Sequence, residues 1–130
     1  MIKIILTLLT FFTFTVQSQT VQLTESEKQK VRQSNVDIAK DSCVYFWTKI
    51  NKTKILTDVG ITLDDQCKCT QDTVAYQVSD ELAAYVTHAF YEIRENGLDK
   101  LNPILKSKID EHQQIINSAM QGCSKKLMKR

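Results

Sequence analysis

Apolar residues recur at helical spacing along much of the chain, beginning with a stripe in its first half. That stripe comprises Val31, Ile38, Ala39, Cys43, Phe46, Trp47 and Ile50. Its intervals match one face of an amphipathic helix. Thr24 precedes the stripe with Glu27 three positions on, the arrangement of a capping box at a helix start. Ser34 and Asp37 form a second start signal, so the pattern predicts one long helix, or two in tandem, ending near Asn51.

Three further stripes follow a segment, NKTKILTDV, that breaks the pattern and predicts a loop ending in a turn at Gly60. Thr62 and Ser79 are candidate N-caps, each followed by acidic residues that the helix dipole favours. Gly97 predicts the end of one helix, and Asn102–Pro103 the start of the last. The three stripes are Leu63, Cys67, Thr70 and Val74; Leu82, Val86, Phe90 and Ile93; and Leu105, Ile109, His112, Ile116, Ala119 and Cys123. The predicted fold is all-α, a small bundle of four to five helices.

The first 18 residues have the features of a removable secretion signal. Lys3 precedes an apolar, threonine-rich stretch from Ile4 to Val16, which is short for a membrane-spanning helix. Val16 and Ser18 suit the −3 and −1 positions for cleavage after Ser18. We therefore expect a signal peptide over residues 1–18 and a mature chain that begins near Gln19, located in the periplasm or outside the cell, with no membrane insertion.

The remaining residues, 19–130, have the size of one domain, about 110 residues. Three glycines and one proline are too few for the many turns of a β-sandwich. The formal net charge is +2, and the basic residues show no concentrated face of the kind that binds nucleic acid. The sequence predicts a single helical domain with a basic C-terminal tail over residues 124–130 and no nucleic-acid partner.

The chain contains four cysteines, Cys43, Cys67, Cys69 and Cys123. An even number in a short exported chain predicts two disulfides. Residues two apart on a helix point about 200° away from each other, so Cys67 and Cys69 cannot pair together but can each hold a different helix. Matching the levels of the cysteines in a helical hairpin favours Cys43–Cys69 and Cys67–Cys123, with the reverse pairing as the alternative.

Redox catalysis and metal binding are weaker explanations of the C-x-C motif. A reactive thiolate needs nearby cations or a helix N-terminus to lower its pKa, and nearby acidic residues outnumber the one lysine of the motif, Lys68. A structural metal site needs four ligands, and His88 and His112 lack ligand spacing to any partner. We expect no cofactor and no metal.

Two sets of residues are candidate binding surfaces, and neither forms a catalytic constellation. The first set is acidic and suits a basic protein partner; it comprises Asp58, Asp64, Asp65, Asp72, Asp80 and Glu81. The second set is aromatic and suits an apolar ligand held between helices; it comprises Phe46, Trp47, Phe90 and Tyr91. No order of serine, histidine and aspartate, and no glycine-rich phosphate loop, indicates an enzyme.

A short exported helical chain with the pattern C…C-x-C…C is similar to small periplasmic proteins, some of which are inhibitors or immunity proteins that block a toxic enzyme. This likeness transfers no site residue, because the C-x-C motif spans only three positions. Rigidity from two cross-links and a local excess of acidic residues favour a non-enzymatic protein-binding module. The alternative function is a carrier of a small apolar ligand in an interhelical pocket.

Overall fold

A computed structural model describes residues 22–50 and 53–129 of the chain. The predicted signal peptide, with its cleavage after Ser18, and the predicted mature start at Gln19 lie outside these residues. The described residues form helices and no strand, which confirms the predicted all-α fold. The elements are α1 (Glu25–Lys49), α2 (Thr53–Asp58), α3 (Leu63–Gln77), α4 (Asp80–Asn96), the 3₁₀ turn η1 (Leu98–Lys100) and α5 (Pro103–Met128).

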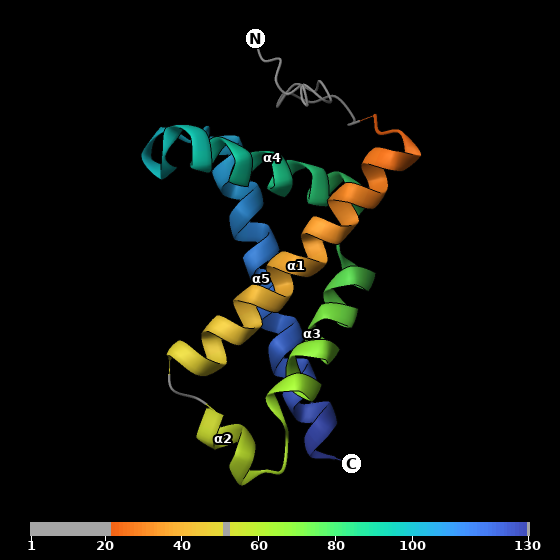
Figure 1. Ribbon diagram of the computed structural model, residues 1–130, viewed down its shortest axis with the longest axis vertical. Coiled ribbons are helices and arrows are strands. Elements are labelled where there is room, and N and C mark those ends of the chain that lie inside the picture. The colour runs from red at the N-terminus through yellow and green to blue at the C-terminus, as the bar shows by residue number, and fades with distance from the viewer. Residues whose placement is uncertain (1–21, 51–52, 130) are drawn as a thin grey trace.

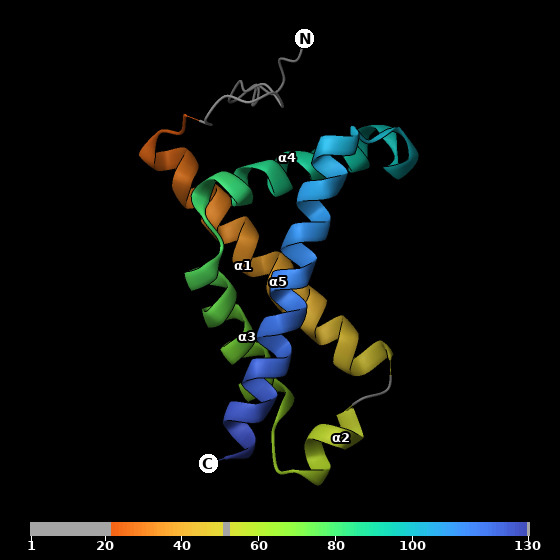
Figure 2. The same cartoon turned by 180° about the vertical axis from the view of Figure 1, so that it is seen from behind.

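The two long helices, α1 and α5, cross each other, and α3 and α4 each pack against both of them (Figure 1). The helix α3 packs against both α1 and α5, while α4 lies across the ends at which α1 and α5 begin. The short α2 lies beyond the C-terminal end of α1, at the opposite end of the molecule from α4, as the reverse view also shows (Figure 2). The fold is therefore a small bundle in which α3 and α4 each join the same two long helices.

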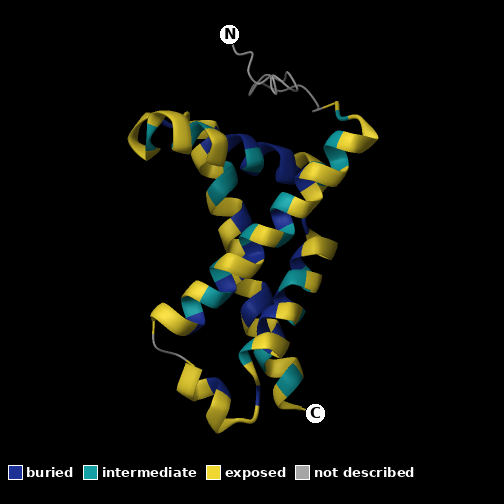
Figure 3. Ribbon diagram, viewed as in Figure 1, coloured by how far each residue is buried: buried dark blue, intermediate teal, exposed yellow. Residues whose placement is uncertain are grey.

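The hydrophobic core receives side chains from all four longer helices. Each of these helices contributes a side chain that is at most 2% exposed: Val31 of α1, Val74 of α3, Val86 of α4 and Ile116 of α5. Buried positions follow one side of α1, α3 and α5, whereas residues 82–86 of α4 are buried on every side of the helix (Figure 3). Most stripe residues meet in one main core, as expected for amphipathic helices. Leu105, Ile93 and Ile109 belong to a second, smaller cluster between α4 and α5.

The helix α1 is one continuous helix and not two in tandem. Its predicted capping box is confirmed, because the Thr24 hydroxyl accepts the Glu27 N–H at 3.2 Å and a Glu27 carboxylate oxygen accepts the Thr24 N–H at 2.9 Å. The second start signal, at Ser34, is not used, since helical hydrogen bonding continues through it. A single helix start therefore sets the direction of the longest apolar stripe.

The other predicted helix starts are also confirmed. Side-chain oxygens of Thr62, Ser79 and Asn102 accept backbone N–H hydrogen bonds at 3.0, 3.1 and 2.7 Å. Gly97 ends α4 with a φ of 93°, a backbone conformation that residues other than glycine rarely adopt. Local chemistry thus determines where α3, α4 and α5 begin.

The segment predicted as a loop before Gly60 contains the helix α2, so that prediction was wrong. The helix has six residues, too few to show a repeating apolar stripe, which is why the sequence pattern did not indicate it. It places one side chain in the core, Leu56, which is 1% exposed. Gly60, with a φ of 77°, then turns the chain toward α3.

A polar pair joins α1 and α5 inside the core. His112 Nε2 lies 2.6 Å from Asn35 Oδ1, and the two residues are 2% and 3% exposed. Burial lowers the pKa of His112, because the surrounding protein cannot solvate a charged ring. The predicted place of His112 on a helical stripe agrees with its position in α5.

The lowered pKa of His112 makes folding stability depend on pH. Below about pH 6.5, the ordinary pKa of histidine, the unfolded chain binds a proton that folded His112 resists, so the free energy of unfolding should fall. His88, whose pKa burial also lowers, should add to this fall. Denaturant unfolding across neutral and mildly acidic pH checks the slope.

The substitution His112→Gln should make that pH profile flatter, because the residue that resists protonation is then absent. An NMR titration of the His112 ring in the unmodified protein gives an independent measurement. A ring that titrates at or above the ordinary value for histidine would contradict this account.

Candidate functional site

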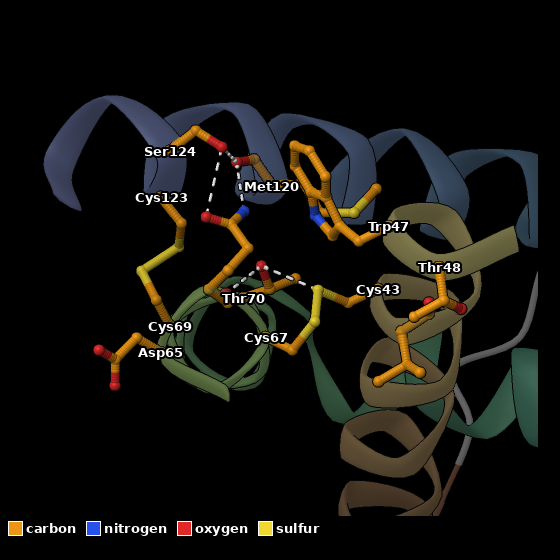
Figure 4. Close-up of a disulfide and its surroundings, with 12 residues drawn as sticks. Cys43, Trp47, Thr48, Asp65, Cys67, Cys69, Thr70, Met120, Cys123 and Ser124 are labelled. Carbon is orange, nitrogen blue, oxygen red and sulfur yellow. Dashed lines mark hydrogen bonds between the residues drawn. A yellow bond between two sulfur atoms is a disulfide. The ribbon is translucent and has the colours of Figure 1, made fainter. Parts of the chain in front are cut away.

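Both disulfides hold the helix α3 (Figure 4). Cys43–Cys67 joins α3 to α1, with Cα atoms 5.6 Å apart, and Cys69–Cys123 joins α3 to α5, with Cα atoms 5.9 Å apart. These distances lie in the ordinary range for disulfides. The prediction that two cysteines of one C-x-C motif would bind α3 to two different helices is confirmed.

The favoured pairing, Cys43–Cys69 with Cys67–Cys123, was wrong. It rested on the level of each cysteine along the helix axis, but two residues differ in level by only about 3 Å. The rotation of α3 decides the pairing instead. Cys67 is 4% exposed and faces the buried Cys43 of α1, whereas Cys69 lies on the other side of α3, toward α5.

A buried glutamine adds a third link between α3 and α5. The Gln66 side chain is 0% exposed; its Nε2 donates to the Met120 carbonyl at 3.0 Å, and its Oε1 accepts from the Ser124 hydroxyl at 3.3 Å. Because a buried amide needs such partners, this pair of bonds fixes the position of α3 along α5. No pattern in the sequence indicates that Gln66 is buried, since glutamine is usually exposed.

The predicted basic tail, residues 124–130, belongs to α5 as far as Met128. Ser124 bonds to Gln66, and the side chain of Leu127 packs against the core. The segment therefore helps to hold α3 in place, while Lys125, Lys126 and Lys129 keep their side chains exposed.

The outer face of α3 carries an acidic stripe that ends in an exposed tyrosine. We define this α3 face as Asp64, Asp65, Lys68, Asp72 and Tyr76, all of them exposed. Their spacing of three and four places them along one side of the helix. Tyr76 is 91% exposed, and Lys68 Nζ lies 3.9 Å from Asp72 Oδ2. The α3 face thus combines a net negative charge with one large aromatic side chain that is almost fully exposed to solvent.

The remaining acidic residues of the predicted set lie on other helices than α3. Asp58 is on α2, where it pairs with Lys54 at 2.9 Å, and Glu81 is in the first turn of α4. Asp80 accepts two hydrogen bonds from Arg32 of α1, at 2.8 and 2.7 Å. These bonds lower the pKa of Asp80 and fix α4 against α1.

The four predicted pocket residues are divided between α1 and α4, and only the two on α1 line the groove against α5. Phe46 and Trp47 contact each other edge to face, with ring centroids 5.1 Å apart, and line a groove against α5. Phe90 and Tyr91 are 38% and 36% exposed on α4 and do not line that groove. The reason is the crossing of the long helices, because α4 covers the starts of α1 and α5 while Phe46 and Trp47 lie near the end of α1.

All four cysteines are bonded in disulfides. Within residues 22–50 and 53–129, no group of three or more histidine, cysteine, aspartate or glutamate side chains could hold a metal ion. In the same part of the chain, none of the helices combines the length and the apolar character needed to cross a membrane. No protein-family model matches the sequence, and no match was found among curated proteins or among solved structures.

The two disulfides should differ in their rate of reduction. Cys43 and Cys67 are 0% and 4% exposed, whereas Cys69 is half-buried and lines a cleft with Asp65, Lys68 and Lys126. A small thiol therefore reaches the Cys69 sulfur first, because thiol–disulfide exchange requires access to a sulfur atom. Mild reduction, alkylation and peptide mass spectrometry should label Cys69 and Cys123 before the other pair.

The same reduction in denaturant provides the control, because the folded-state difference in access is then lost and the rates should become similar. Labelling of Cys43 and Cys67 first in the folded protein would contradict the arrangement described above.

Proposed function

We propose that this protein is a non-enzymatic, exported protein-binding module that presents the α3 face to a basic partner protein. The observation that carries the proposal is Tyr76, which is 91% exposed beside an acidic stripe on the helix that both disulfides hold. Such a side chain contributes nothing to the core. Its exposure therefore favours a role in contact with another molecule.

Rigidity supports a binding role for α3. Cross-links to α1 and α5, together with the bonds of Gln66, hold the helix before any partner arrives. A surface that is already ordered loses less conformational entropy on binding, so more of its contact energy contributes to affinity. This is the property expected of an inhibitor or immunity-type protein, which must block another protein tightly.

The composition of the α3 face supports a partner of positive charge. Tyrosine is enriched among the residues that dominate binding energy at interfaces, because it buries a large area and has few rotatable bonds. Asp64, Asp65 and Asp72 surround one lysine, Lys68, and their excess negative charge attracts a basic surface and increases the association rate. Tyr76 would contribute affinity, and the aspartates would contribute orientation.

The disulfides support the proposed location. Structural disulfides persist in oxidising compartments, and the two in this protein join helices far apart in sequence. Together with the predicted signal peptide over residues 1–18, they favour export to the periplasm or the extracellular medium. A partner is therefore to be sought among proteins of those compartments.

The substitution Tyr76→Ala tests the proposal against a matched control. Tyr45, on α1, is 61% exposed, so Tyr45→Ala removes the same side chain from a different surface. Exposed substitutions of this kind change stability by only about 0.5 kcal/mol. Immobilised protein should retain a basic partner from an exported-protein extract, and Tyr76→Ala should weaken the binding of that purified partner by about tenfold or more.

Tyr45→Ala should leave that affinity unchanged, and Asp72→Asn should mainly reduce the association rate at low salt. Equal losses of affinity for Tyr76→Ala and Tyr45→Ala would contradict binding through the α3 face. Recovery of no partner at low and moderate salt would count against the binding function itself.

A further inference from the structure

The groove between the C-terminal halves of α1 and α5 has the dimensions of a small-molecule site. Its volume is about 490 Å³, within the range of about 300–1,000 Å³ found for ligand pockets. The lining comprises Phe46, Trp47, Asn117, Met120, Gln121, Ser124 and Lys125. It is separate from the α3 face, with which it shares no residue.

The lining divides into an apolar part and a polar part. Phe46, Trp47 and Met120 provide the apolar surface, and Trp47 and Met120 are 8% and 5% exposed, so they form a fixed floor and do not move freely in solvent. Exposed side chains of α5, Asn117 and Gln121, provide the polar wall. A molecule with an apolar body and a polar end matches such a surface better than a uniformly apolar or uniformly polar one.

One charge determines which polar end fits. Among the residues that the structure describes, Lys125 is the single charged residue of the lining, and no acidic side chain lines the groove to neutralise it. An anionic group placed at Lys125 would gain a charge-assisted hydrogen bond at the rim of an apolar surface. A cationic group placed there would be repelled. The charge of the groove therefore selects an anion.

Trp47, at the same place, carries a buried hydrogen-bond donor, the indole Nε1, that has no partner within the described part of the chain. A buried donor without a partner destabilises a folded protein by about 1–3 kcal/mol, so a phenylalanine would suit a purely structural role better. The ring that carries this donor lines the apolar floor of the groove.

We propose that this groove binds a single-chain carboxylate amphiphile, with the chain against Phe46, Trp47 and Met120 and the carboxylate at Lys125. The inference goes beyond the protein-binding function and does not depend on it. Of the aromatic residues that the sequence suggested for an apolar ligand, Phe46 and Trp47 belong to this site.

Decanoate is a suitable probe, and 1-decanol is its uncharged counterpart. Trp47 is the only tryptophan of the chain, so its fluorescence reports on the groove directly. Decanoate should change that emission saturably, and calorimetry should give the same affinity. Lys125→Gln should weaken decanoate binding by about tenfold, the loss expected for one charge-assisted bond, and should leave 1-decanol binding within about twofold.

Lys126→Gln is the matched control, because Lys126 is the next residue of α5, is also exposed, and is absent from the groove lining. It should leave the binding of both probes unchanged. Gln121→Phe, which fills the groove from an exposed position, should weaken both probes. Tyr76→Ala should bind decanoate normally, which separates this site from the α3 face.

Three results would overturn the inference. The first is no saturable binding of decanoate. The second is an equal loss for Lys125→Gln and Lys126→Gln, which would indicate general electrostatic attraction. The third is binding of anionic phosphatidylglycerol vesicles without binding of free decanoate, which would indicate a membrane surface as the partner.

Discussion

Two disulfides that share one helix are the constraint on which the rest of this structure depends. Cys67 and Cys69 lie on opposite sides of α3. Cys67 is bonded to α1 on one side, and Cys69 is bonded to α5 on the other. The cross-links join residues 24 and 54 positions apart, and in the chain-entropy model loops of these lengths stabilise a fold by roughly 3 and 4 kcal/mol. A domain of this size builds only a modest core, and constraints of this magnitude are comparable to its whole expected stability.

The same constraint explains where free surface remains. Because α3 is held from both sides through Cys67, Cys69 and Gln66, its outer face needs no further contact with the protein and can carry Asp72 and Tyr76. The groove beside Trp47 lies between the C-terminal halves of α1 and α5, and no residue of α3 or α4 is among its described lining residues. The two proposed binding surfaces are thus consequences of how one central helix is attached.

Local features of this fold could be predicted from the sequence, while features set by helix rotation and crossing could not. The start of α1 at Thr24 depends on a side chain and a backbone group three residues apart, so the sequence contains all the necessary information. The pairing of Cys67 depends on how α3 is rotated about its own axis. Each residue along a helix turns the side-chain direction by about 100°, so a small error in the assumed rotation exchanges the partners of Cys67 and Cys69. Gln66 was missed because its burial depends on partners on α5, Met120 and Ser124, which no local pattern specifies.

Disulfide mapping of the exported, unreduced protein tests the central claim most directly. Lys68 separates the two cysteines of the C-x-C motif, so trypsin cleaves between them and places Cys67 and Cys69 on different peptides. Mass spectrometry should then find the Cys43 peptide linked to the Cys67 peptide, and the Cys69 peptide linked to the Cys123 peptide. A link between Cys43 and Cys69, or the presence of four free thiols, would contradict the account of α3 as a helix fixed on both sides.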